Sequence, residues 1–236
     1  MSEPLTELLE RASAVMMKHA QYRPKLNMTI TFGHVAQVPR QVRALREMVL
    51  QRRPRVICEM GFNAGHSAIV FLENTSAQLN SFDLFNLPYS APTRGFVAAR
   101  YPGRVKFHEG NTKATVPRYN QAVEEGRAAP CDIWLVDADH YKNVWLDFKH
   151  VLGASSRNGT LIVADDTTER FPFVLRYWRR LVLSRNVSQL SCETVELGTM
   201  KTRRGWENNT KGWCVGEVVR RAGGRRAHGG AATHRR

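Results

Sequence analysis

Three short apolar runs in this chain each end in acidic side chains. The runs are residues 133–136 before Asp137, residues 161–164 before Asp165 and Asp166, and residues 56–58 before Glu59. Short apolar runs between helical patterns are typical of buried parallel strands. In an open parallel sheet, ligands bind at the carboxyl ends of the strands, and acids that gather there are costly unless a cation or a polar ligand meets them. The sequence therefore predicts an α/β fold with a small-molecule site and a divalent metal at one edge of its sheet.

The length and composition are those of one globular domain. The chain has 236 residues, of which 42% are hydrophobic and 24% are charged, so a sizeable core is expected. We expect a single domain over residues 1–219, with an N-terminal helical cover (1–52) and a cofactor-binding core (54–219). No apolar run is long enough to span a bilayer, and the first ten residues carry acids but no apolar signal region. These features predict a cytoplasmic protein with no membrane partner.

The four cysteines do not form a metal motif. They are Cys58, Cys131, Cys192 and Cys214, and none lies at metal-ligand spacing from another. Because Cys58 lies inside an apolar run and Cys131 just before one, we expect buried, reduced thiols. A disulfide is compatible with four cysteines, but nothing in their spacing indicates one.

The positive charge is concentrated at the end of the chain. The formal net charge is +14, and six of the arginines lie in residues 220–236, which contain no acid. This tail consists mainly of Gly, Ala and Arg and has almost nothing to bury, so it is predicted to be disordered. It could contact RNA or another anionic surface weakly, but a solvated tail without a partner is favoured because no recognition fold accompanies it.

The rest of the chain alternates between helix-like and strand-like segments. Residues 4–18 and a segment that begins at Pro39 carry apolar side chains at helical spacing. The predicted strands that follow are 55–60, 79–84, 104–108, 132–137, 160–165, 190–197 and 213–219, and the predicted helices are 65–74, one ending at Arg100, 113–125, 141–152 and 171–184. A basic, polar stretch (201–212) joins the last two strands. This alternation predicts a mostly parallel, doubly wound sheet with helices on both faces.

The segment 56–67 has the order strand, glycine turn, helix start. Gly61 lets the backbone turn where a side chain would block a ligand, and Gly65 allows close packing as the helix begins. Its spacing is Gly-x-x-x-Gly rather than Gly-x-Gly-x-x-Gly, which disfavours a dinucleotide. Asp83, at the end of the second predicted strand, can accept both hydroxyls of a ribose. Each feature alone is weak, but together they favour an adenosine-containing cofactor.

These motifs in series resemble those of a known enzyme family. The series is Glu59-x-Gly61-x-x-x-Gly65-x-Ser67, then Asp83, then Asp137-Ala138-Asp139, then Asp165-Asp166. It resembles the class I S-adenosylmethionine-dependent O-methyltransferases, and most of all their metal-dependent branch, which includes catechol, caffeoyl-CoA and macrolide-sugar enzymes. The resemblance implies a Rossmann-like, seven-stranded sheet whose last strand is antiparallel.

The resemblance also implies where the cofactor S-adenosylmethionine lies. The residues expected to contact it are Glu59, Gly61, Phe62, Asn63, Gly65, Ser67, Asp83, Asn111, Thr112, Asp137 and Asp139. Glu59, Gly61 and Ser67 would line the methionine end. Asp83 would hold the ribose, and residues 110–112 would lie near the adenine. The family often has an acid where this chain has Asn111, so that contact is the least secure.

Three acids are the expected metal ligands. Asp137, Asp165 and Asp166 offer hard oxygen ligands from two neighbouring strand ends, and Mg²⁺ prefers such ligands. The family has an Asp at the first position and an Asp-Asn or acid-Asp pair at the others. The alternative for Asp165 is that it only caps the following helix.

His140 is the expected base. It follows Asp137 by three residues, where the catechol-type enzymes of the resemblance carry a lysine and the sugar-type enzymes a histidine. A neutral imidazole can accept a hydroxyl proton near pH 7. Lys142 is the alternative base, and a loop histidine with only a packing role is the alternative for His140. The resulting hypothesis is methyl transfer to a hydroxyl of a small molecule, either a sugar or a phenol- or catechol-like natural product.

Other functions compete with this one. The net charge of +14 suggests a nucleic-acid methyltransferase, but the chain has no Asn-Pro-Pro-Tyr-like motif and no paired catalytic cysteines. A scaffold that binds S-adenosylmethionine without turnover would not need the acids and His140. The edge of the sheet or the first two helices could also pair subunits into a homo-oligomer.

Overall fold

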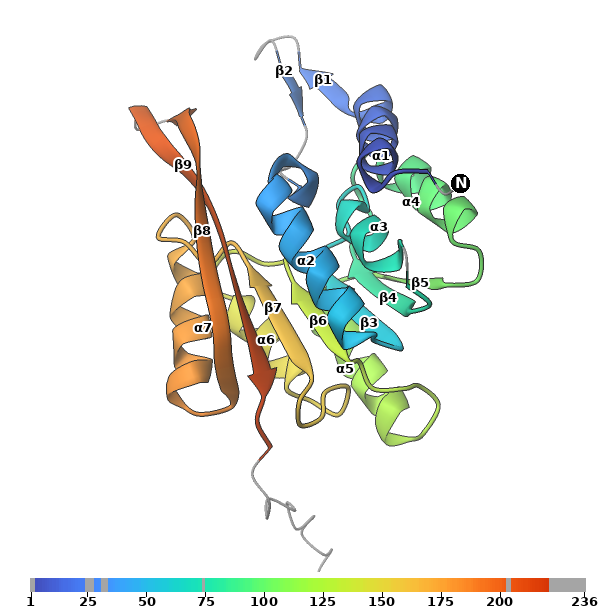
Figure 1. The fold of residues 1–236 in the computed structure, drawn as a ribbon, viewed down its shortest axis with the longest axis vertical. Helices are drawn as coiled ribbons and strands as arrows, with labels where there is room; N and C mark the ends of the chain where they lie inside the picture. Colours follow the sequence, from blue (N-terminus) through green and yellow to red (C-terminus); the bar gives the residue numbers. More distant parts are fainter. Residues whose placement is uncertain (1–2, 24–27, 31–33, 74, 203–204, 221–236) are drawn as a thin grey trace, which may run out of the picture.

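The computed structural model describes residues 3–23, 28–30, 34–73, 75–202 and 205–220. A seven-stranded sheet lies at its centre, with the strand order β5-β4-β3-β6-β7-β9-β8 (Figure 1). The strands are β3 (Val56–Met60), β4 (Gln78–Asp83), β5 (Val105–Glu109), β6 (Ile133–Val136), β7 (Leu161–Asp165), β8 (Val187–Thr202) and β9 (Gly205–Val218). β3 to β7 pair in parallel, and the last strand, β9, is antiparallel to β7 and β8. The expected Rossmann-like fold is confirmed.

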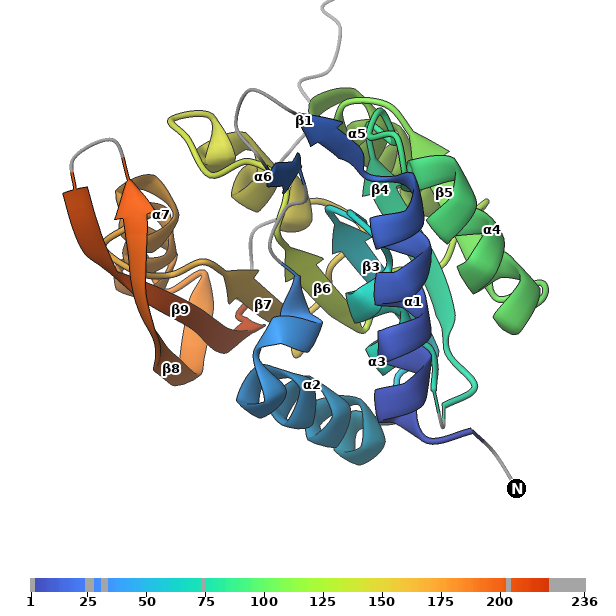
Figure 2. The ribbon, with the colours of Figure 1, turned by 90° about the horizontal axis from the view of Figure 1, so that it is seen from above.

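Helices cover both faces of this sheet. They are α1 (Leu5–His19), α2 (Pro39–Arg52), α3 (His66–Leu72), α4 (Ser90–Arg100), α5 (Thr112–Glu124), α6 (Val144–Val151) and α7 (Pro172–Leu183). Apolar side chains of α1 to α4 form one core with one face of the sheet, and those of α5 to α7 form a second core with the other face (Figure 2). Alternate residues of β6 divide between the two, since Ile133 and Leu135 join the first core and Trp134 and Val136 the second. This is the two-residue period of a strand buried on both faces.

The N-terminal segment lies over the first face. The two predicted helices are observed as α1 and α2, and α2 begins at Pro39 as expected. Between them, β1 (Gln21–Arg23) and β2 (Met28–Ile30) form a small antiparallel pair, and a 3-10 turn covers Val35–Gln37. This stretch shows no helical or strand period in the sequence, because each of these pieces is only three residues long.

The last two strands are longer than predicted. Asp165, at the end of β7, pairs with Trp213, so β9 residues before Trp213 extend past the carboxyl end of β7. There they pair with β8 to form a hairpin arm (residues 194–202 and 205–212) that rises beyond the edge of the sheet (Figure 1). The polar stretch 201–212 had been expected to be a connection. Its described residues (201–202 and 205–212) form strand instead, because the backbone groups of the two strands satisfy one another in an antiparallel ladder.

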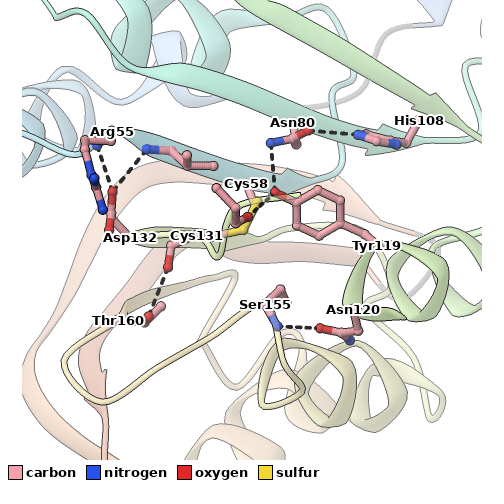
Figure 3. The surroundings of a disulfide bond; sticks show 12 residues. Arg55, Cys58, Asn80, His108, Tyr119, Asn120, Cys131, Asp132, Ser155 and Thr160 are labelled. Atoms are coloured by element: carbon pink, nitrogen blue, oxygen red, sulfur yellow. Dashed lines mark hydrogen bonds between the residues drawn. A yellow bond between two sulfur atoms is a disulfide. The ribbon is translucent and has the colours of Figure 1, made fainter. Parts of the chain in front are cut away.

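The prediction of reduced thiols is wrong. Cys58 in β3 is bonded to Cys131, which directly precedes β6 (Figure 3), and Cys192 in β8 is bonded to Cys214 in β9. The Cα atoms of these pairs are 5.9 Å and 4.1 Å apart, because each pair joins neighbouring strands. The partners are 73 and 22 residues apart along the chain, so only the strand order brings them together.

The first disulfide is surrounded by buried polar groups. The Tyr119 hydroxyl donates a hydrogen bond to the Ala129 carbonyl and accepts one from Asn80, which in turn forms a hydrogen bond with His108 (Figure 3).

The predicted basic tail lies outside the described residues, except for Arg220. None of the described helices has the length and apolar character of a membrane span.

Candidate active site

A cavity of about 900 Å³ lies along the carboxyl edge of the sheet. Its wall includes one predicted site residue from the end of each parallel strand. In the spatial order of the strands, these are Asn111 after β5, Asp83 of β4, Gly61 after β3, Asp137 after β6 and Asp166 after β7. Segments up to 105 residues apart in the chain thus form one continuous wall at the edge of the sheet where the site is predicted.

The glycine turn after β3 is held by Asp83. Gly61 has φ +94°, and a Cβ atom there would lie 2.1 Å from the carbonyl oxygen of Asp137. Oδ2 of Asp83 accepts hydrogen bonds from the backbone N–H groups of Phe62 (2.6 Å) and Asn63 (3.2 Å). Gly61, Asn63 and Asp83 all line the cavity. Only glycine permits this close approach of the turn to the strand-end loop of β6.

Several predicted cofactor residues lie beneath this turn rather than in the wall of the large cavity. Glu59 is fully buried, and its two carboxylate oxygens accept hydrogen bonds from the hydroxyls of Ser67 and Ser81, both at 2.8 Å. Burial raises the pKa of Glu59 to about 7, although the two serines oppose this shift. Gly65 packs against the ring of Phe62, to which a Cβ atom would come within 2.7 Å. These residues support the turn from below.

The wall beyond β5 is built around the start of α5. Asn111 caps this helix by accepting a hydrogen bond from the N–H of Lys113 at 3.0 Å, and the Thr112 hydroxyl donates to Asp147 at 2.7 Å. Lys113 Nζ lies 2.9 Å from Oδ2 of Asp139. This ion pair connects the segment after β5 to the loop after β6. Sequence reasoning missed Lys113, because nothing in the pattern pairs these two loops.

The three predicted metal ligands do lie together, and a lysine lies among them. Lys211 Nζ, from the hairpin arm, is 2.7 Å from Oδ2 of Asp165 and 2.8 Å from Oδ1 of Asp166. Gln41 of α2 donates a hydrogen bond to Oδ1 of Asp165 at 2.8 Å. Both oxygens of Asp165 are therefore occupied. The helix-capping alternative for Asp165 is not observed, since α7 has Phe171 at its N-cap position.

His140 joins the other two acids. Its Nε2 atom is 2.8 Å from Oδ2 of Asp166 and 3.3 Å from Oδ1 of Asp137. Ligand atoms of Asp137, His140 and Asp166 lie within 4.8 Å of one another, so among the described residues these three form a group that could hold a metal ion. Asp165 is outside that group. Lys142, the alternative base, is exposed and does not belong to the cavity wall.

The charges of this cluster are strongly coupled. Burial alone would lower the pKa of His140, but its hydrogen bonds to Asp137 and Asp166 and their charges raise it to about 10. For Lys211, the attraction of the three carboxylates outweighs burial and holds the pKa above its ordinary value. Burial would raise the pKa of Asp166, but His140 and Lys211 hold it below its usual range. The contacts with Asp137 and Asp166 thus favour the protonated form of His140, and those with the carboxylates favour the ammonium form of Lys211.

The N-terminal cover contributes a pair of histidines that sequence reasoning left without a role. The rings of His34 and His66 stack at 3.7 Å between centroids, and His66 Nε2 lies 2.9 Å from the Ser13 hydroxyl. Burial lowers the pKa of His34 to about 4 and that of His66 to about 3, so both rings are neutral. His34 lines the same cavity as Asp137 and Lys211, and Leu197 and Thr210 of the hairpin arm line it as well.

Comparison with known proteins identifies the fold family. Residues 58–167 match the family model described as a methyltransferase domain, from β3 to the loop after Asp165 and Asp166. This match identifies the central part of the chain as a methyltransferase domain. Comparison with curated protein sequences finds no match.

Solved structures with the same fold as this chain are distant in sequence. An O-methyltransferase from Bacillus cereus in complex with S-adenosylhomocysteine has a TM-score of 0.61 and 18% identity, over 93% of each chain. The O-methyltransferase TomG from Streptomyces achromogenes, in complex with S-adenosylmethionine, has a TM-score of 0.63 and 18% identity, over 92% of this chain and 91% of that one. A proposed RNA methyltransferase from Pyrococcus horikoshii has a TM-score of 0.63 and 10% identity, over 93% of this chain and 100% of that one. The shared fold therefore does not identify an acceptor. The acceptor has to be inferred from the residues of the site.

Proposed function

We propose that this methyltransferase transfers a methyl group to a hydroxyl of a small molecule, with sugars and phenol- or catechol-like natural products as the acceptor class. The observation that carries the proposal is the single cavity that joins Asp83 and Gly61 to the cluster of Asp137, His140 and Asp166. One end has the features of a nucleoside site, and the other has the acid–base groups that a hydroxyl acceptor needs.

The residues along the cavity fit S-adenosylmethionine. The turn at Gly61 lets a ligand approach the backbone, and Asp83 presents a carboxylate beside it for the ribose hydroxyls. Asn111 and Thr112 lie at the far end for the adenine. When bound, the cofactor would supply the methyl group: its S–CH₃ bond would break as the O–CH₃ bond forms, and S-adenosylhomocysteine would leave. Glu59, Phe62, Gly65 and Ser67 keep the turn in place from beneath, and we assign them that supporting role.

Asp137 and His140 are the proposed catalytic residues. Because the contacts of His140 with Asp137 and Asp166 favour its protonated form, we assign proton acceptance to Asp137, which takes the proton of the acceptor hydroxyl as the O–CH₃ bond forms. His140 remains an imidazolium between Asp137 and Asp166 and offsets their charge. Its ring also limits where the acceptor oxygen can lie, which favours an in-line approach.

A magnesium ion on Asp137, Asp165 and Asp166 does not fit the side chains as they lie. Asp165 already accepts hydrogen bonds from Gln41 and Lys211, and both oxygens of Asp166 meet cations. The smaller group that includes His140 would need an unprotonated imidazole, and Mg²⁺ prefers oxygen ligands. We therefore derive no catalytic step through a metal.

The residues around Asp137, His140 and Asp166 favour a small acceptor over a nucleic acid. His34 of the N-terminal cover and Leu197 of the hairpin arm contribute to the wall near Asp137 and Asp166, which limits the size of the acceptor. A scaffold without turnover would gain nothing from burying two cations among three acids.

The possible contact of the basic tail with RNA and the possible homo-oligomer stay predictions. The two disulfides remove the support that reduced cysteines gave to a cytoplasmic location, since disulfides persist mainly in oxidising compartments.

The first experiment is a calorimetric titration of S-adenosylhomocysteine into the purified protein. Micromolar binding is expected, and a screen of catechols, flavonoids and sugars with labelled S-adenosylmethionine should then give a methyl ether. Absence of binding by a folded sample would contradict the proposal. Methylation of RNA but of none of the small molecules would favour the nucleic-acid alternative.

A further inference from the structure

We propose that Lys211 is a built-in cation that takes the place of a divalent metal, so that methyl transfer by this protein needs no added metal ion. The inference deepens the proposed function and rests on it. Lys211 Nζ lies between two carboxyl groups, 2.7 Å from Asp165 and 2.8 Å from Asp166. Its side chain is only 17% exposed, so the ion pairs are shielded from water.

The backbone fixes Lys211 at this position. Lys211 pairs with Val195 across the hairpin arm, and Trp213, two residues later, pairs with Asp165 at the end of β7. The carbonyl of Gly212 accepts a hydrogen bond from the N–H of Thr167 at 3.0 Å. A Cβ atom at Gly212 would lie 2.7 Å from Cγ2 of Thr168, so a glycine is needed for the arm to come this close to the loop after β7. The backbone of Lys211 is therefore held in place by strand pairing and by the hydrogen bond at Gly212. This fixes the start of the side chain that carries the ammonium group.

The carboxylate oxygens have little capacity left for a second cation. Lys211 and Gln41 occupy the two oxygens of Asp165, and Lys211 and His140 occupy the two oxygens of Asp166. A magnesium ion requires about six oxygen ligands in near-octahedral geometry. It would have to displace the ammonium, which would then remain buried without its partners at a large cost.

Lys211 can also act on the acceptor. An ammonium has three protons, of which Asp165 and Asp166 take two, and Lys211 belongs to the cavity wall. We assign the third proton to an oxygen of the acceptor. A hydrogen bond of this kind strengthens as the oxygen gives up its own proton to Asp137, which is the contribution that a metal makes in the metal-dependent branch.

The test combines metal binding with activity. For the wild-type protein, initial rates should change less than twofold between EDTA and added Mg²⁺, and electron paramagnetic resonance should detect no stoichiometric binding of Mn²⁺. Lys211→Met should lose at least roughly 100-fold in kcat without metal, with the Kd for S-adenosylhomocysteine within about threefold of wild type. It should also gain Mn²⁺ binding, because the carboxylates lose their cation. Lys149→Met, an exposed lysine on α6, is the matched control and should leave both readouts unchanged.

If Lys211→Met does not fold, Lys211→Arg serves as the second variant. It keeps a cation in the site and should stay active without metal at a reduced rate. Stoichiometric Mn²⁺ binding by the wild-type protein, or activity that EDTA abolishes and Mg²⁺ restores, would overturn the inference. The Mn²⁺ measurement needs no acceptor, so it gives a result even if no substrate is found. Failure of the proposed function is distinguishable, since it would show as a folded protein that does not bind S-adenosylhomocysteine.

Discussion

Nε2 of His140 lies 2.8 Å from Oδ2 of Asp166, closer than it lies to Asp137, its neighbour in the sequence. His140 thus bridges the loops that follow β6 and β7. Since Asp166 also binds Lys211, its carboxylate is shared by two cations. Both contacts favour the protonated form of His140 in the wall of the cavity, beside the carboxylate that we assign as proton acceptor.

Substitution of His140 tests this role. His140→Gln should lower kcat by roughly 100-fold, because Asp137 and Asp166 lose the charge that offsets them, while cofactor affinity should stay within about threefold of wild type. Asp137→Asn should lower kcat at least as much, since it removes the proton acceptor. Initial rates and calorimetry with S-adenosylhomocysteine give the two quantities. An unchanged kcat in His140→Gln would exclude His140 from catalysis.

The link between Asp83 and the glycine turn predicts a defect in binding. Asp83→Asn keeps the shape of the side chain but weakens the charge-assisted hydrogen bonds from Phe62 and Asn63, and it reduces the ability to accept two ribose hydroxyls. We expect the Kd for S-adenosylhomocysteine to rise roughly 10-fold to 100-fold by calorimetry.

Glu109→Gln is the control for this substitution. Glu109 ends the neighbouring strand β5, lies outside the wall of the large cavity and pairs with Arg94 at the surface. Equal affinity of Asp83→Asn and Glu109→Gln would mean that Asp83 does not contact the nucleoside.

The sequence could predict the carboxyl edge of the sheet because each acid directly follows its own strand. An apolar run of four or five residues marks a buried strand, and the next residue must then lie at the strand end, whatever the rest of the chain does. Asp137 and Asp165 are both found in this way. The glycine turn is equally local, since Gly61 and its strand are adjacent in the chain.

The partners of these acids could not be predicted, because they come from remote segments. Lys211 is 45 residues from Asp166, and Gln41 is 124 residues from Asp165. Lys211 reaches the site only because Trp213 pairs with Asp165, and the register of two antiparallel strands depends on their packing. In the sequence, Lys211 is one of several cations in a polar stretch. The contact of His140 with Asp166 could not be predicted for the same reason, since Asp166 is not its sequence neighbour.

The buried Glu59 predicts a pH dependence of stability. Its pKa is about 7 in the folded protein and about 4.5 when unfolded, so the folded state binds the proton more tightly. The stability that this group contributes is complete below pH 4.5 and is lost as the pH rises to 7. A shift of this size corresponds to about 3 kcal/mol. Between pH 5 and pH 8, the free energy of unfolding in urea should therefore fall more for wild type than for Glu59→Gln, in which the group cannot ionise. Parallel curves for the two proteins would contradict the assignment.

The disulfide between Cys58 and Cys131 should be a main source of stability. It links β3 to the start of β6 and closes a segment of 73 residues, which restricts the unfolded chain and corresponds to about 4 kcal/mol in the chain-entropy treatment. The double variant Cys58→Ala/Cys131→Ala should therefore unfold at a lower urea concentration than wild type. Cys192→Ala/Cys214→Ala opens the 22-residue segment of the hairpin and should lose less, about 3 kcal/mol. Reductant should lower the unfolding midpoint of wild type toward those of the variants. Four titratable thiols in the unreduced, denatured protein, with a midpoint that reductant does not change, would show that neither disulfide forms.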